Sequence, residues 1–255
     1  MLYKGYRMKL IQAWAESLTL LKPENFKLFL LVTLKSIGQT YKVLFSKFWV
    51  LVIASLGMDL GAYYLLTQTG NPEFQVSSFL LIGLWVLIFI GATIALMALG
   101  MALFLIARPS VAIKDWNYLS NYWRHFIYFF FAWFIALICK HLFLPFFIYW
   151  IFFVAFLLDS NGRLQLAGLS LWRALKMLWY NLPFVGITTI LFSLLFFPFA
   201  LLLGYGQSIL PLWMFILRFC VVNLIQLPLL ICFYINFYVK KKHEQFNLYF
   251  PEKGQ

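Results

Sequence analysis

Two ionisable residues, Asp59 and Arg218, lie inside long apolar runs of the sequence. A charge at the centre of a bilayer costs at least about 2.5–3.5 kcal/mol, so charges there mark ion pairs or functional contacts. Counting residues from the outer ends of the two apolar runs places both side chains at a similar depth. This spacing favours a buried pair between Asp59 and Arg218. The alternatives are a contact with an ion or substrate, and extension of both side chains to the outer interface.

Two amides, Asn223 and Gln226, are three residues apart and therefore share one face of a predicted helix. Proline residues that could kink the neighbouring helices, Pro198, Pro211 and Pro228, are close by in sequence or in the predicted fold. Amides beside kinks could line a polar cavity, but in membrane proteins such groups more commonly hold adjacent helices together by hydrogen bonds.

No catalytic or cofactor motif occurs in the chain. HExxH, GxSxG, P-loop and GxGxxG patterns are absent, and the eight acidic residues are scattered. The histidines His125, His141 and His243 fall near predicted membrane interfaces. The cysteines Cys139, Cys220 and Cys232 lie in apolar stretches without metal-ligand spacing. We therefore expect a protein that is not an enzyme and that binds neither a cofactor nor a metal ion.

The composition is that of an integral membrane protein. Of the 255 residues, 64% are apolar and 11% are charged, whereas a soluble domain has about 45–50% apolar and about 25% charged residues. The net charge of +12 comes from basic residues that lie mainly between the apolar runs. This distribution indicates contact with anionic lipid headgroups rather than with nucleic acid.

The apolar runs predict an all-α bundle of six transmembrane spans, because about 20 apolar residues are needed to cross a bilayer. Five spans is the alternative count. Residues 126–158 contain Lys140 and His141 near their middle, followed by Pro145, so they form either two short spans or one broken span. The predicted spans are 48–66, 79–107, 126–142, 145–158, 183–203 and 209–239.

The basic residues predict the orientation of these spans. With both termini in the cytoplasm, all of the 20 lysine and arginine residues except Lys140 and Arg218 fall on the cytoplasmic side, including those of the tail 240–255. This excess follows the positive-inside rule. We therefore expect a multi-pass protein of the cytoplasmic (inner) membrane.

Amphipathic segments lie on the predicted cytoplasmic side. Residues 1–47 form two predicted helices that are separated by Pro23. Residues 163–180 form a third, in which Arg173 and Lys176 share a face while Trp172 and Trp179 fall at headgroup depth. In that segment we expect Tyr180 beside the basic residues and the apolar residues opposite, namely Leu164, Ala167, Leu171, Ala174 and Leu178.

Small residues predict a packing seam between the first two spans. Gly57 and Gly61 form a GxxxG pattern, and Gly91 and Ala95 have the same spacing in the next span. Small side chains allow helix backbones to approach closely in lipid.

Residues 152–192 resemble uncharacterised bacterial six-helix inner-membrane proteins. The resemblance rests on Asp159 at the end of a span, Ala167, Leu169 and Ser170 in an amphipathic helix, and Asn181 before the next span. The stretch is also similar to the membrane domain of some glycerophosphodiester phosphodiesterases. The resemblance implies an all-helical inner-membrane protein and carries over no catalytic residue.

These observations give two functional hypotheses. The first is a non-enzymatic membrane protein that binds anionic lipid, or a membrane-bound partner, through its basic and aromatic cytoplasmic helices. The alternative is a small transporter or permease component that uses the intramembrane polar residues Asp59, Arg218, Asn223 and Gln226. A transporter requires a water-accessible cavity that reaches these residues.

Overall fold

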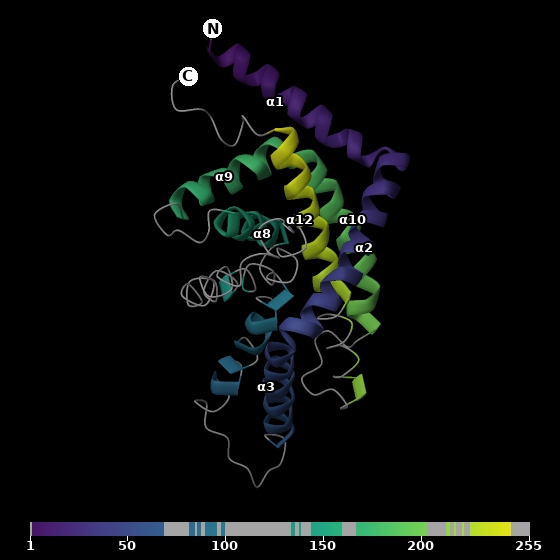
Figure 1. The fold of residues 1–255 in the computed structure, drawn as a ribbon, viewed down its shortest axis with the longest axis vertical. Coiled ribbons are helices and arrows are strands. Elements are labelled where there is room, and N and C mark those ends of the chain that lie inside the picture. The colour runs from purple at the N-terminus through teal and green to yellow at the C-terminus, as the bar shows by residue number, and fades with distance from the viewer. Residues whose placement is uncertain are drawn as a thin grey trace.

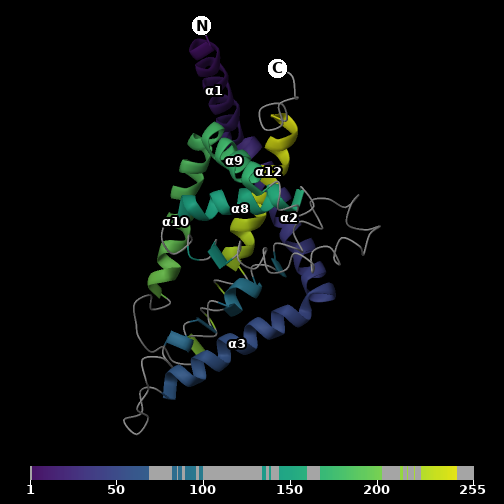
Figure 2. The same ribbon diagram turned by 90° about the vertical axis from the view of Figure 1, so that its left-hand side faces the viewer.

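The structure, a computed structural model, describes residues 2–68, 144–159, 167–202 and 225–245, together with short helical pieces within 82–99, 134–138 and 213–221. Within these residues the chain is all-helical, as predicted. The main elements (Figures 1 and 2) are α1 (Leu2–Leu18), η1 (Thr19–Leu21), α2 (Pro23–Lys47), α3 (Trp49–Gln68), α8 (Leu144–Asp159), α9 (Ala167–Tyr180), α10 (Leu182–Leu202) and α12 (Leu227–Glu244).

The break between α1 and α2 is caused by Pro23. In a continuous helix the Thr19 carbonyl would accept a hydrogen bond from the backbone N–H four residues further on. That residue is Pro23, which has no N–H. The Thr19 carbonyl instead accepts bonds from the Lys22 backbone N–H at 3.3 Å and from the Asn25 side-chain amide at 2.8 Å. Lys22 is extended, and α2 begins at the proline. The chain therefore turns sharply at the position expected from the sequence.

Helix α12 is the centre of the fold. Its residues Leu227–Tyr238 are almost all buried, on every side of the helix. A helix that is apolar all round belongs in a core, and three other helices surround this one. Aromatic and polar contacts join α12 to α2, α8 and α10.

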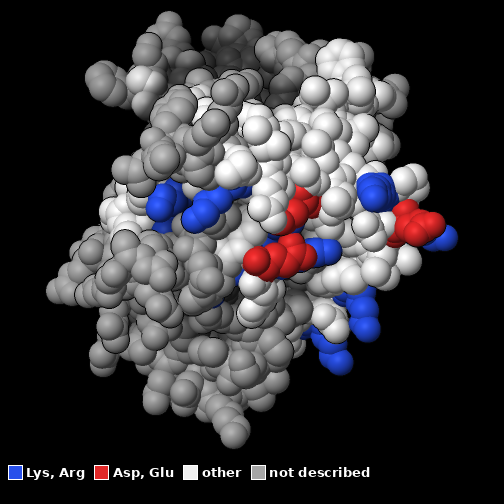
Figure 3. Space-filling model, turned by 90° about the horizontal axis from the view of Figure 1, so that it is seen from above, with Lys and Arg blue, Asp and Glu red and all other residues white. Residues whose placement is uncertain are grey.

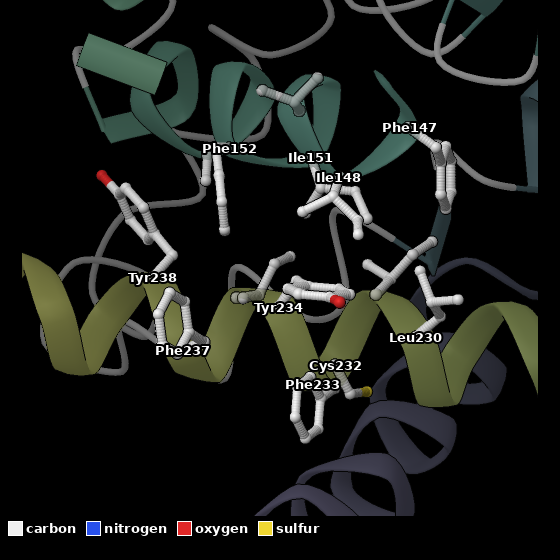
Figure 4. Close-up of a cluster of buried hydrophobic side chains, with 14 of the residues drawn as sticks. Phe147, Ile148, Ile151, Phe152, Leu230, Cys232, Phe233, Tyr234, Phe237 and Tyr238 are labelled. Carbon is white, nitrogen blue, oxygen red and sulfur yellow. The ribbon is translucent and has the colours of Figure 1, made fainter. Parts of the chain in front are cut away.

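Large aromatic side chains fill the space between these helices. Phe233 of α12 meets Phe29 of α2 edge to face with ring centroids 4.9 Å apart, and Phe192 of α10 at 5.1 Å. Phe184 stacks on Phe237 at 4.5 Å with an interplanar angle of 6°. Figure 4 shows Phe147 and Phe152 of α8 on the other side of α12. Offset and edge-to-face pairs of this kind stabilise a core beyond the area that they bury.

One buried hydrogen bond lies inside this aromatic core. The hydroxyl groups of Thr188 on α10 and Tyr234 on α12 are 2.8 Å apart, and Thr188 also bonds to the Phe184 carbonyl at 2.8 Å. A buried hydroxyl without a partner is costly, so the bond explains how Tyr234 can be completely buried.

The pair α9–α10 is bent by 80° at Asn181. Asn181 is fully buried, and its side-chain amide donates to the Met177 carbonyl at 2.9 Å. Pro183 occupies the first turn of α10, where a missing N–H is tolerated. Helix α9 therefore lies across one end of the bundle while α10 runs along it (Figure 1).

Within the described residues, one helix, Pro23–Ser46, is long and apolar enough to cross a membrane, judged by length and composition. A second span is present if the two helices Gly168–Tyr180 and Leu182–Pro198, which are bent by 80° relative to each other, are counted as one. The helices Trp49–Leu65 and Leu144–Leu157 are apolar but shorter. Several predicted spans lie partly or wholly outside the described residues, so the six-span count stays a prediction.

Candidate membrane-surface site

Helix α9 has one face buried in the bundle and one face exposed. Ser170, Ala174 and Met177 have no exposed surface and pack toward α8 and α10. The exposed side chains on the outward face are large and apolar: Leu169 (42% exposed), Trp172 (55%), Leu175 (45%) and Trp179 (48%). Their spacing of three or four residues places them in one stripe. A surface of this kind needs an apolar environment.

Basic side chains border this stripe. Arg173 and Lys176 are both half-buried and lie along one edge of this exposed stripe. The Lys176 ammonium lies 5.8 Å from the centre of the Trp172 ring, within cation–π distance. Leucine and tryptophan on one face, with lysine and arginine at the edge, are typical of a helix lying at a membrane surface.

The structure adds detail to the predicted faces of α9. Tyr180, which we expected beside Arg173 and Lys176, is the last residue of the helix and is buried. Ala174 of the predicted apolar stripe is also buried, as is Ser170. Small side chains such as these allow helix backbones to approach closely. Leu169 and Leu175, which belonged to neither predicted stripe, are exposed with the two tryptophans.

Trp14 of α1 is a positioning residue that the sequence analysis did not single out. Its indole Nε1 donates to the backbone carbonyl of Trp179 at 3.0 Å. The usual α-helical donor to that carbonyl would be the backbone N–H four positions on, but that residue is Pro183, which has no N–H. Pro183 is the feature of the sequence that could have revealed this contact, because it predicts that the Trp179 carbonyl needs a hydrogen-bond donor from elsewhere. The bond holds α1 against the end of α9.

We expect Trp14→Phe to lower the free energy of unfolding by about 0.5–1.5 kcal/mol, the typical net value of one hydrogen bond. Phenylalanine keeps the ring but removes the donor, so the Trp179 carbonyl loses its bond. Thermal unfolding of detergent-solubilised protein measures the effect. Gln12→Ala is the control, because Gln12 is exposed and its side-chain amide donates to Glu16, which is also exposed, at 3.1 Å. Equal stability of Trp14→Phe and the wild type would contradict this function of the indole.

Charged side chains gather at the end of the molecule where α1 and α9 lie, as the view from above shows (Figure 3). At this end α12 finishes with Lys240, Lys241 and Lys242. Lys241 is buried, with 2% of its side chain exposed, and its ammonium donates to Glu244 at 2.7 Å. Helix α10 carries no charged residue, and α3 carries only Asp59. Within the described residues, most charged side chains therefore belong to α1, α2 and the end of α12, and few to α3 and α10.

The predicted intramembrane polar residues fall largely outside the described part of the chain. This applies to Arg218, to Asn223 and to the side chain of Asp59. Gln226 is half-buried and immediately precedes α12, where its side chain makes no capping hydrogen bond. The Asp59–Arg218 pair and the polar cavity both stay predictions.

The glycines of the GxxxG pattern are on an exposed face of α3. A Cβ atom added at Gly57 or Gly61 would meet no heavy atom within 4 Å. In contrast, Gly91 is buried and Ala95 is half-buried. The described residues therefore place no close helix approach at Gly57 and Gly61, and the packing seam between the first two spans stays a prediction.

Among the described residues, no group of three or more His, Cys, Asp and Glu side chains could hold a metal ion. Comparisons with protein-family models, with curated proteins and with solved structures found no match. The resemblance of residues 152–192 to six-helix inner-membrane proteins is therefore an expectation from those residues alone.

Proposed function

We propose that the chain is a non-enzymatic, multi-pass protein of the cytoplasmic membrane whose helix α9 binds the anionic membrane surface. The observation that carries the proposal is the outward stripe of α9, formed by Leu169, Trp172, Leu175 and Trp179 and bordered by Lys176 and Arg173. Tryptophan prefers the headgroup level of a bilayer, and each basic residue near an anionic surface contributes about 1 kcal/mol to binding.

The rest of the bundle supports a membrane setting. Helix α10 exposes a continuous set of large apolar side chains, and their exposed fractions reach 66% at Leu194. Helix α3 does the same. Lipid tails would cover these surfaces, and the charged end of the bundle would lie at the cytoplasmic headgroups. Residues Leu2–Leu18 and the last turn of α12 are at this same end (Figure 1), which agrees with two cytoplasmic termini.

The depth of α9 in the membrane tests the proposal. A nitroxide label is attached at Leu175→Cys in a variant whose three native cysteines are replaced by alanine, and the full chain is reconstituted into vesicles. We expect the label to lie about 5–10 Å below the headgroups, the depth typical of interfacial helices. It should therefore collide with oxygen more often than with a water-soluble nickel chelate. Ala15→Cys, on the exposed face of α1, is the control and should favour the chelate.

The electrostatic part of the proposal is tested with the same label. We expect Leu175→Cys to lie deeper in vesicles that contain phosphatidylglycerol than in pure phosphatidylcholine, and Lys176→Gln or high salt should reduce the difference. Equal depth in both lipids would remove the preference for anionic headgroups. A label exposed to water in both would contradict an interfacial α9.

A further inference from the structure

Helix α2 combines the length of a membrane span with an outward face that carries lysines among apolar side chains. It is the one described helix that passes as a span without a bend. Its buried face consists of Phe29, Thr33, Thr40 and Leu44. Its opposite side exposes Lys35 and Lys42, with Lys27 beside them, among the exposed apolar side chains of Leu28, Leu31, Val32, Leu34 and Phe45. A lysine in the middle of a bilayer costs at least about 2.5–3.5 kcal/mol, so α2 is a poor candidate to cross the bilayer with this face toward lipid.

The contacts of α2 show that it crosses α12 at a wide angle. Phe26 and Phe29 both contact Phe233, while Thr40 lies 4.0 Å from the sulfur of Cys232. Together with a hydrogen bond between Ser36 and Asn236, these contacts extend over about 21 Å of α2, at 1.5 Å per residue, but over only about 6 Å of α12. If the two helices ran side by side, contacts farther along one helix would also lie farther along the other. The two ribbons cross in the same way in Figure 1.

The crossing point lies close to the charged end of α12. One contact between α2 and α12 towards this end is a hydrogen bond of 3.2 Å from the Asn236 amide to the Ser36 hydroxyl. Asn236 and Cys232 precede Lys240 by about 6 and 12 Å of helix, respectively. Interfacial helices bury their apolar face about 5–10 Å below the headgroups. A helix that crosses α12 at this level therefore lies at the boundary between headgroups and acyl chains.

We propose that α2 lies in the plane of the membrane surface and does not cross it, and that Lys35 and Lys42 bind the phosphate groups of anionic phospholipids. This inference rests on the proposed function, because it requires α12 to cross the membrane with Lys240 at the headgroups. The two lysines are seven residues apart on one face of the helix, and the only acidic residue of α2 is Glu24 in its first turn. Leu31 and Phe45 are exposed beside these lysines, so the lysine side chains would extend to the headgroups while the apolar side chains lie at the edge of the acyl region.

The orientation is tested by measuring depth at two positions on α2. Nitroxide labels are placed singly at Leu31→Cys and Phe45→Cys, both 54% exposed, in the full chain without native cysteines. An in-plane helix predicts nearly equal depths. A transmembrane helix predicts a difference of about 21 Å for 14 residues, and that result would overturn the proposal.

A matched pair on α10 separates this inference from the proposed function. Labels at Ile187 and Leu194, seven residues apart on an exposed face, should differ in depth by about 10 Å if α10 crosses the membrane. A gradient on α10 together with equal depths on α2 supports the inference. A gradient on both helices overturns the inference but leaves the proposed function intact. The absence of a gradient on α10 contradicts the membrane bundle itself.

Lipid binding is tested at Gly38, which lies between the two lysines and has open space for a Cβ atom. A fluorophore at Gly38→Cys is titrated in phosphatidylcholine nanodiscs with phosphatidylglycerol that carries a nitroxide quencher near the top of its acyl chain. We expect Lys35→Gln and Lys42→Gln each to weaken quenching about fivefold, as for the loss of one basic contact to an anionic surface. Lys9→Gln on α1 is the control and should leave quenching unchanged. Unchanged quenching in both α2 variants would overturn the assignment of the lysines to lipid phosphate.

Discussion

Phe233→Ala is expected to lower the free energy of unfolding in mild detergent by about 2–4 kcal/mol. Phe233 is fully buried, and its ring contacts Phe29 at 4.9 Å, Phe192 at 5.1 Å and Phe184 at 6.0 Å. The substitution removes contacts between α12 and two other helices and leaves a cavity. Large-to-small changes of this kind cost about 3–5 kcal/mol in soluble cores. We expect a smaller loss here because lipid or detergent solvates the unfolded apolar chain better than water does.

Phe197→Ala is the control for this prediction. Phe197 is 62% exposed on α10, so its truncation removes few contacts and should change stability by less than about 0.5 kcal/mol. Thermal or denaturant unfolding of both variants in the same detergent gives the comparison. Equal losses for the two variants would contradict the central position of Phe233 in the fold.

Asp59→Asn and Arg218→Gln are each expected to destabilise the protein by about 3–5 kcal/mol, the usual cost of leaving one buried charge without its partner. This prediction rests on the sequence, because both residues lie in apolar runs at a similar predicted depth. The double substitution should be less harmful than the sum of the single ones, because no unpaired charge is left. A double-mutant cycle on detergent-solubilised protein measures the coupling between the two side chains.

Lys140→Gln is the control for the charge pair, because Lys140 lies at a predicted outer turn rather than inside a span. Strict additivity of the Asp59 and Arg218 substitutions would show that the two charges do not interact. If additivity is found and a single substitution abolishes a cellular phenotype at normal abundance, the transporter hypothesis gains support.

Some helix boundaries could be predicted because they depend on local chemistry, although α12 continues to Glu244, beyond the predicted end of the last span at residue 239. Pro23 removes a backbone donor and prevents α1 from continuing, whatever surrounds it. The amphipathic spacing of Arg173, Lys176, Trp172 and Trp179 likewise requires only a regular helix, and α9 supplies it. The sequence also indicated Pro183 at the start of a helix, although its effect on the Trp179 carbonyl was not anticipated.

Which helix contacts which, and with which face, was decided by tertiary packing. The periodicity of α9 allowed several faces to point inward, and in the folded protein Ser170 and Ala174 are buried while Leu175 is exposed. Trp14 and Trp179 are 165 residues apart, so no local pattern could pair them. The same holds for the crossing of α2 over α12, because Phe29 and Phe233 are far apart in the sequence and meet only in the folded protein. Local hydrogen bonding sets where a helix begins and ends, whereas the fit between distant side chains sets how the helices meet.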